Sequence, residues 1–196
     1  MPWQQTYIIF LIFEKRTFAD MRKLTMDELG RKSVADFKMA NKTPIVVVMD
    51  NIRSMHNVGS VFRTSDGFLI DGICLCGFTP QPPHRDIHKT ALGSTETVDW
   101  MHYENTTDAV NELKAKGYKV YAIEQTEGSI SLEKFKALNP EVTNFPLAFV
   151  FGNEVDGVEE QVITLCDGVI EIPQWGMKHS LNISVAAAIV LWEFVR

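Results

Sequence analysis

Residues 149–156 read FVFGNEVD, and residues 172–192 read IPQWGMKHSLNISVAAAIVLW. In the second stretch, Pro173 and Gly176 mark a loop. Three polar residues then precede an almost wholly apolar run: Ser180, Asn182 and Ser184. A helix that is apolar on all sides is typically buried. Polar side chains at its buried start need hydrogen-bond partners, which are either the protein's own turns or a bound ligand.

Strand patterns alternate with helix patterns along the rest of the chain. The predicted strands are Ile45–Asp50, Gly72–Cys76, Val98–His102, Lys119–Ile123, Leu147–Phe151 and Val169–Ile172. The predicted helices are Asn57–Leu69, Thr107–Lys116, Glu159–Leu165 and the apolar run after Asn182, and Pro80–Leu92 is predicted to be a long loop. This alternation predicts an α/β fold with a parallel sheet that helices cover on both faces.

Three loops of this predicted sheet carry the candidate site. Asp50–Asn57, Gly152–Gly157 and Pro173–Asn182 each follow a strand. Ligands of parallel sheets bind at the carboxyl ends of strands, so we expect these loops to converge. Arg63 lies six residues after Asn57 on the same predicted helix. Its guanidinium either binds a phosphate or pairs with a carboxylate such as Asp66.

The other local motifs are weaker. Gly152–Gly157 (GNEVDG) is either a polar turn or a place where backbone approaches a ligand closely. The chain has no GxGxxG, GxxxxGK[ST] or GxSxG motif. His84 and His88 are spaced like metal ligands, but Arg85 follows the first of them where HExxH has Glu. We predict no metal site, and Arg85 with Lys89 favours a phosphate contact.

Length, charge and cysteine content set the remaining limits. The chain of 196 residues fits one domain with a short extension, and its net charge is −6. Residues 21–42 carry +3, which predicts a modest basic arm or an ordinary solvated helix. Three cysteines fit a reducing cytoplasm. Tyr7–Phe13 is apolar but too short to cross a membrane. Residues 1–20 are either an added edge strand or a flexible tail, or the natural chain starts at Met21.

Taken in order, several of these segments resemble a known family. Asn57–Arg63, Phe151–Glu154 (FGNE) and Ile172–Ala186 (IPQWGMKHSLNISVA) are similar to the three signature motifs of the SPOUT superfamily. More narrowly, they resemble the TrmH (SpoU) family of RNA ribose 2′-O-methyltransferases, and Lys89–Gly93 (KTALG) resembles a further family segment. The resemblance covers about residues 44–192. It divides the chain into an extension, 1–43, and a methyltransferase domain, 44–196.

The resemblance implies more than the residues alone. It implies a C-terminal trefoil knot, bound S-adenosylmethionine, and a homodimer whose active site is shared between protomers near the final helix. The implied catalytic residues are Asn57, Arg63, Glu154, Ser180 and Asn182. The implied cofactor-binding residues are Phe151, Gly152, Ile172, Gly176, Met177 and Leu181. The RNA-binding candidates are Arg53, Arg85 and Lys89. A guanidinium hardly deprotonates, so we interpret Arg63 as a phosphate clamp and not as a base.

The expected reaction is methyl transfer to a ribose 2′-hydroxyl of structured RNA. Transfer RNA is the leading substrate, and ribosomal RNA is the alternative. A protein of this fold that binds RNA without catalysis is a second class. A dinucleotide oxidoreductase is a third, although the chain lacks its glycine motif.

Overall fold

The computed structural model describes residues 22–25, 27–178 and 180–196. The chain divides into two compact units, Met1–Ser33 and Val34–Arg196. The predicted boundary at residue 20 lies outside the described residues. In the first unit, a single 3-10 turn, η2 (Asp27–Leu29), follows Thr25, whose backbone N–H donates to the carboxylate of Glu28. Arg22 also pairs with Glu28, at 2.5 Å, so part of the predicted basic arm is neutralised.

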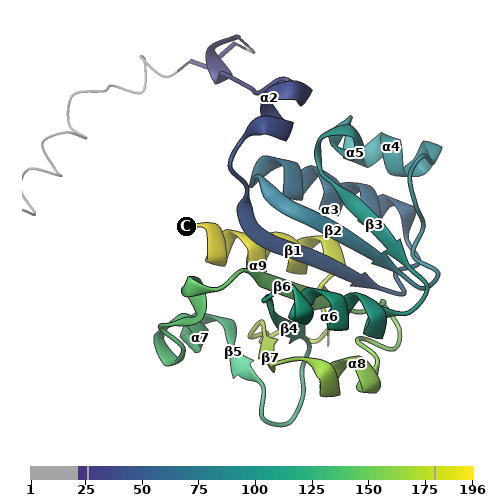
Figure 1. Cartoon of the computed structure of the whole chain (residues 1–196), viewed down its shortest axis with the longest axis vertical. Coiled ribbons are helices and arrows are strands. Elements are labelled where there is room, and N and C mark those ends of the chain that lie inside the picture. The colour runs from purple at the N-terminus through teal and green to yellow at the C-terminus, as the bar shows by residue number, and fades with distance from the viewer. Residues whose placement is uncertain (1–21, 26, 179) are drawn as a thin grey trace, which may run out of the picture. The chain divides into compact units, whose positions relative to one another are not determined.

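In the described part of the second unit, seven strands form one sheet with the order β3-β2-β1-β6-β4-β7-β5 (Figure 1). Every pair of neighbouring strands is parallel. The strands are β1 (Thr43–Asp50), β2 (Ile70–Cys76), β3 (Trp100–Tyr103), β4 (Lys119–Ile123), β5 (Ile130–Ser131), β6 (Leu147–Phe151) and β7 (Gly168–Glu171). The predicted parallel sheet is confirmed.

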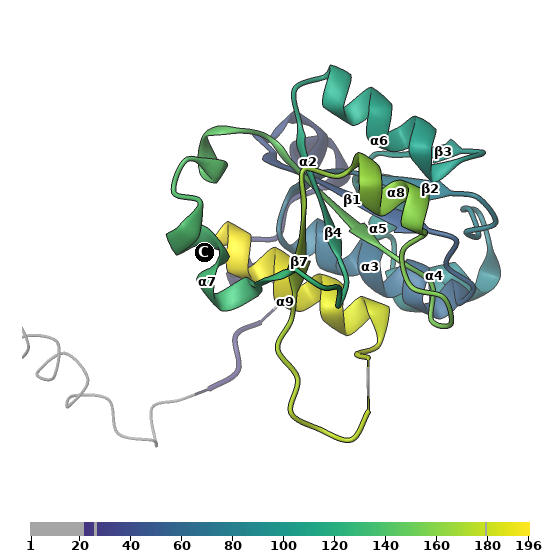
Figure 2. The same ribbon diagram turned by 90° about the horizontal axis from the view of Figure 1, so that it is seen from below.

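Helices cover both faces of this sheet, also as predicted. The helices of the second unit are α2 (Val34–Met39), α3 (Met55–Gly67), α4 (Arg85–Ala91), α5 (Ser94–Thr97), α6 (Thr106–Ala115), α7 (Leu132–Leu138), η3 (Val142–Asn144), α8 (Glu160–Leu165) and α9 (Ile183–Val195). Figure 2 shows α6 and α8 on one face and α3 and α9 on the other. Both faces of the parallel sheet are therefore covered by helices, as is usual for such sheets.

The central strand β1 explains why both faces are buried. Its apolar residues alternate between two hydrophobic clusters, because successive side chains of a strand point to opposite faces. Val47 and Met49 pack in the cluster beneath α3 and α9. Val46 and Val48 pack in the cluster beneath α6 and α8. The unbroken apolar run that predicted a buried parallel strand therefore supplies both cores.

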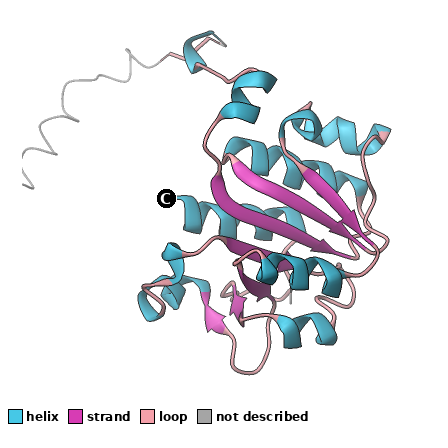
Figure 3. Ribbon diagram, viewed as in Figure 1, coloured by secondary structure: helices cyan, strands magenta, loops and turns pink. Residues whose placement is uncertain are grey.

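The structure corrects one predicted element and adds others that were not predicted. The predicted loop Pro80–Leu92 contains helix α4, which begins after His84, whose side chain accepts a hydrogen bond from the Asp86 N–H. Ile87 and Ala91, one helical turn apart, are buried. A second short helix, α5, precedes β3, and β5 with α7 fills the segment that carried no prediction (Figure 3).

The prediction that the final helix is wholly buried is wrong for one side of α9. Ile183, Ala187, Val190 and Leu191 are buried against the sheet and α3. Val185, Ile189 and Trp192 are exposed. These three residues are four and three positions apart, so they form one apolar stripe along the helix.

Two predictions about the whole chain are not tested by the structure. The trefoil knot that the resemblance implies stays a prediction, and so does the division at residues 43 and 44, since the second compact unit begins at Val34. Among the described residues, no helix is both long and apolar enough to span a membrane.

Candidate functional site

A cleft of about 690 Å³ opens at the carboxyl-terminal ends of the strands. Its walls come from the residues that follow β4, β6 and β7 and from the first turn of α9. The predicted loops 152–157 and 173–182 both contribute lining residues. The third predicted loop, 50–57, reaches the cleft through hydrogen bonds to its lining residues. The predicted convergence of the three loops is therefore realised in the geometry.

A chain of three polar side chains joins these loops. The Asn57 amide donates to Glu154 Oε1 at 2.8 Å. The Asn182 amide donates to Asn57 Oδ1 at 3.1 Å. Asn182 also begins α9, because its Oδ1 accepts a hydrogen bond from the Ser184 N–H at 3.0 Å. Residues 97 and 125 positions apart in the sequence thus fix one another at the mouth of the cleft.

The loop after β6 is held by its own polar groups. Asn153 Oδ1 accepts hydrogen bonds from the N–H groups of Val155 and Asp156, both at 2.9 Å. The backbones of Asn153 and Gly157 pair with each other in both directions at 3.1 Å. A Cβ atom at Gly152 would lie 1.9 Å from the Gly157 carbonyl carbon. The turn itself therefore requires glycine at position 152. This agrees with the interpretation of GNEVDG as a polar turn.

The charge of the lining is one-sided. Three carboxylates line the cleft: Glu124, Glu154 and Asp156. No Lys or Arg is among the described residues that line it. The other lining residues are polar amides and hydroxyls or apolar side chains such as Phe151, Ile172 and Leu181. Such a cleft favours a ligand that carries positive charge and an apolar or aromatic body over a polyphosphate.

A buried carboxylate, Asp50, is hydrogen-bonded to the segment that forms one wall of the cleft. Asp50 has no exposed surface, at the end of β1. Its carboxylate accepts hydrogen bonds from the Glu159 N–H and the Asn51 amide, both at 3.1 Å, and from the Thr106 hydroxyl. Burial raises the pKa of Asp50, and the hydrogen bonds from Thr106 and Glu159 oppose that rise. Because Glu159 follows the cleft-lining residues 152–158, Asp50 anchors one end of that wall.

The predicted cofactor-binding residues divide into two groups. Phe151, Gly152, Ile172 and Leu181 line the cleft, as does the predicted catalytic residue Ser180. Gly176 and Met177 are exposed in the loop before α9 and do not line it. In Figure 2 this loop extends away from the sheet. A cofactor contact of Gly176 and Met177 stays a prediction.

Arg63 does not reach the cleft of its own chain. It is exposed on α3, six positions after Asn57, which is roughly 9 Å along a helix. Among the described residues it has no hydrogen-bond or ion-pair partner, so the alternative pairing with Asp66 is not formed. Asp66 instead accepts a hydrogen bond from the Thr97 hydroxyl.

The RNA-binding candidates lie at two places on the surface. Arg53 follows β1, and its guanidinium is 3.7 Å from the cleft-lining carboxylate of Asp156. Arg85 is exposed at the start of α4. Lys89, one turn later, pairs with Asp86 at 2.6 Å, which lowers its value as a phosphate contact. In the described chain, no three His, Cys, Asp or Glu residues gather as metal ligands would.

The family model described as the SpoU rRNA Methylase family matches residues 44–192, three quarters of the chain. The chain belongs to this family. A relative in Thermus thermophilus, named tRNA (guanosine(18)-2′-O)-methyltransferase, is 30% identical over 176 residues, which cover 90% of this chain and 86% of the relative. Another in Vibrio parahaemolyticus, named 23S rRNA (guanosine-2′-O-)-methyltransferase RlmB, is 30% identical over 169 residues, covering 86% and 66%.

A solved structure of a family relative has the same fold. It is the AdoMet-bound rRNA methyltransferase from Sinorhizobium meliloti, which is 27% identical, with a TM-score of 0.71 over 79% of this chain and 56% of that one. The chain spans between 58% and 66% of the length of three of the curated relatives that it matches. The resemblance to the TrmH (SpoU) family is thereby confirmed.

One residue of this SpoU-type site is missing from the sequence-based prediction. Glu124 follows β4 directly and lines the cleft. Its carboxylate accepts hydrogen bonds from the Gln125 N–H at 2.8 Å and the Val158 N–H at 3.2 Å. It therefore joins the β4 end to the loop after β6. A carboxylate immediately after a predicted strand was a usable signal, because carboxyl ends of parallel strands meet at one edge.

Proposed function

We propose that the protein transfers a methyl group from S-adenosylmethionine to a ribose 2′-hydroxyl of structured RNA. The observation that carries the proposal is the acidic cleft where the loops bearing the three family motifs meet. Family membership supports the reaction class, and the names of the relatives support RNA as the substrate. The chemistry of the cleft supports the methyl donor.

The residues present fit this donor. A cleft of about 690 Å³ is in the range for a drug-sized ligand. Glu124 and Glu154 complement a sulfonium and an ammonium group, and apolar lining residues suit an adenine ring. We assign Phe151, Ile172 and Leu181 to that ring. When bound, S-adenosylmethionine would supply an electrophilic methyl group to the ribose oxygen, with S-adenosylhomocysteine as the second product and the hydroxyl proton passing to solvent.

The hydrogen-bonded chain of Asn57, Glu154 and Asn182 positions the reacting groups in this proposal. Each side chain is held by another, which reduces the entropy lost when a nucleotide binds. Ser180 adds a hydroxyl at the same wall of the cleft. Positioning and charge then account for the catalysis in this proposal.

The missing guanidinium comes from a second copy of the chain in this proposal. The apolar stripe Val185, Ile189 and Trp192 on α9 is exposed, and burying it favours association. Helices α3 and α9 are in contact, and Arg63 is exposed on α3. Across a two-fold interface, Arg63 would then serve the partner's cleft as a phosphate clamp. We propose this shared site as the reason for the dimer.

Transfer RNA is the preferred substrate in this proposal, and ribosomal RNA is the alternative. The Thermus thermophilus tRNA enzyme and this chain match over most of both lengths, 86% and 90%. The Vibrio parahaemolyticus rRNA enzyme is matched over 66% of its length. The net charge of −6 predicts weak, salt-sensitive RNA affinity.

Titration calorimetry followed by a transfer assay tests the proposal. We expect heat of binding with S-adenosylmethionine and with its demethylated product, and none with NAD⁺, because the lining has no cation for a pyrophosphate. With tritium-labelled donor, label should enter RNA as alkali-resistant linkages, more in a tRNA fraction than in ribosomal RNA.

Each remaining class of function has a distinct outcome in this experiment. Donor binding and RNA binding without any transfer of label would identify a non-catalytic member of the family. Heat with NAD⁺ alone would indicate an oxidoreductase. Absence of heat with both the donor and its product would refute the proposed methyl donor.

A further inference from the structure

Phe78 is an exposed aromatic ring on a turn that is firmly held. Its side chain is 58% exposed, two residues after the end of β2. The Phe78 N–H donates to Asn51 Oδ1 at 3.3 Å, and the preceding Gly77 N–H donates to the Tyr103 carbonyl at 2.9 Å. His102 Nε2 lies 3.0 Å from the Gly77 carbonyl oxygen. A loop fixed in this way displays the ring to solvent without the entropy cost of ordering it on binding.

The turn has no room to fold inward. Gly77 has φ +59°, and a Cβ atom there would lie 2.0 Å from Asn51 Oδ1. The next residue, Thr79, is buried, and its hydroxyl bridges the Met49 carbonyl at 3.0 Å and the Ile52 N–H at 2.9 Å. The chain on either side of Phe78 is therefore held in place, before it by the Gly77 bond to β3 and after it by the Thr79 side chain at the end of β1.

A guanidinium accompanies this ring. The Arg53 guanidinium carbon lies 5.9 Å from the centre of the Phe78 ring, within cation–π range. The same guanidinium is 3.7 Å from Asp156, which lines the cleft. Arg53 therefore connects the exposed ring to the rim of the candidate active site.

The two residues lie beside the cleft along the same edge of the sheet. Phe78 follows β2, Arg53 follows β1, and the cleft wall at 152–157 follows β6. These strands are adjacent in the order β2-β1-β6, so the ring lies two strand spacings, roughly 10 Å, from that wall. A nucleotide chain that enters the cleft and continues along this edge passes over Arg53 and Phe78.

We propose that Phe78 and Arg53 form a stacking platform for an unpaired base adjacent to the methylated nucleotide. The inference rests on the proposed function and adds a preference for single-stranded RNA. Aromatic rings and Arg planes stack on the faces of unpaired bases, and the faces of paired bases are already covered. The Arg53 charge also complements the phosphate beside such a base.

Fluorescence anisotropy with the full-length chain tests the platform. The probe is a labelled single-stranded RNA oligonucleotide, compared with the same strand in a duplex. Phe78→Ala should weaken single-strand binding by about fivefold to 150-fold, the range for loss of one stacked base, and leave duplex binding unchanged. Phe78→Trp should retain the affinity, because it keeps a larger ring.

The chain offers a matched control at the opposite edge of the sheet. Phe145 precedes β6, is 42% exposed, and has the Lys119 ammonium 5.8 Å from its ring centre. It combines an exposed ring with a cation, as Phe78 does, but lies at the amino ends of the strands. Phe145→Ala should leave single-strand binding unchanged.

The outcomes separate the platform from the proposed function. Donor binding by calorimetry does not involve Phe78, so its absence refutes the methyl donor and not the platform. Unchanged single-strand affinity in Phe78→Ala would overturn the platform while leaving methyl transfer intact. Equal losses for single strand and duplex, an equal loss in Phe145→Ala, or no binding by the unaltered chain would overturn it as well.

Discussion

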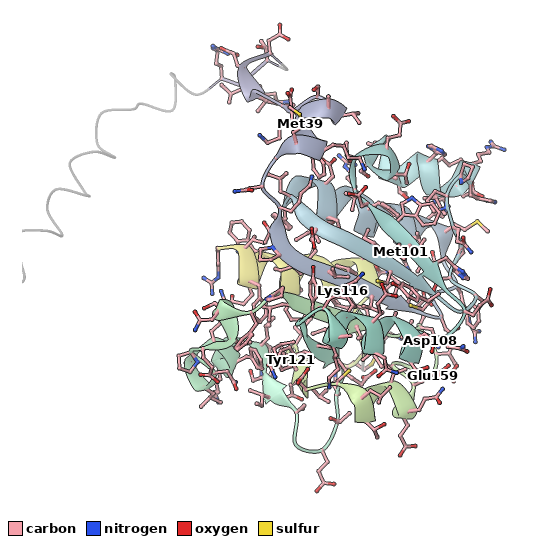
Figure 4. All side chains as sticks on the ribbon, in the orientation of Figure 1. Met39, Met101, Asp108, Lys116, Tyr121 and Glu159 are labelled. Carbon is pink, nitrogen blue, oxygen red and sulfur yellow. The ribbon has the colours of Figure 1, made fainter. Side chains whose placement is uncertain are left out.

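Asp50 is the residue at which stability and the site are most closely connected. It is a buried carboxylate at the end of the central strand. Its partners belong to α6, through Thr106, and to Glu159 at the start of α8, which Figure 4 labels. One side chain thus ties β1 to two helices of one face and to the wall of the cleft.

Titration of Asp50 should appear in the stability of the fold. Burial raises the pKa of Asp50, so the folded chain holds this proton more tightly than the unfolded chain. Its contribution to the free energy of unfolding is therefore largest below the ordinary Asp pKa of about 3.9, and is lost as pH rises through the folded pKa. Asp50→Asn has no such proton.

Urea unfolding of both proteins at several pH values checks this prediction. The free energy of unfolding of the unaltered chain, minus that of Asp50→Asn, should fall as pH rises from about 3.5 toward 7. Taking the difference removes the other carboxylates, whose contributions are common to both proteins. A difference that stays level or rises with pH would contradict the assigned direction.

At this scale, sequence reasoning located motif residues better than their partners. Asn57, Glu154 and Asn182 were predicted to share a site, because the loops after parallel strands meet at one edge, and they do form one hydrogen-bonded chain. Glu124 was missed because no motif marks it. Arg63 was assigned to the same site, but a helix places it about a turn and a half beyond Asn57.

Among the elements, helix α4 shows the limits of pattern reasoning. Its segment reads as a loop because of Pro82, Pro83 and two His residues. The helix is nevertheless stable because His84 caps it and Ile87 is buried. Tertiary packing against α3 decides its structure, and that contact is invisible in a short window of sequence. The strands, with their unbroken apolar runs, were predictable.

The close contact between α3 and α4 depends on glycine at position 59, which has no side chain. A Cβ atom at Gly59 would lie 2.1 Å from Thr90 Oγ1 and 2.3 Å from the Ile87 carbonyl oxygen. We expect Gly59→Ala to force the helices apart and lower the free energy of unfolding by about 1–3 kcal/mol. Urea denaturation, monitored by circular dichroism, measures the change.

Gly67 is the matched control for this substitution. It lies in the same helix, with no atom within 4 Å of its added Cβ position. Gly67→Ala should leave stability unchanged or raise it by up to about 1 kcal/mol, because Ala favours helix over Gly. If Gly59→Ala behaved like Gly67→Ala, the close approach of the two helices would not govern their packing.

On the scale of the whole molecule, helix α9 has an exposed apolar side that its own chain does not cover. Its apolar composition predicted complete burial, and the structure buries only the side that faces the sheet and α3. Composition reveals that a helix needs apolar cover, but not whether the cover comes from its own chain or another. The exposed apolar stripe on α9 and the distance of Arg63 from the cleft of its own chain are both explained if two copies of the chain assemble into a dimer.

A dimer that combines two different inactive variants tests whether the active site is shared between two chains. In the proposed assembly, each site combines Glu154 of one chain with the partner's Arg63, so Arg63→Ala and Glu154→Ala homodimers should both lose methyl transfer. A heterodimer of the two variants, isolated with two different affinity tags, should regain about half of the unaltered activity, because one of its two sites has both residues. If Arg63 served its own chain, each site would lack one residue, and the heterodimer would be as inactive as its parents.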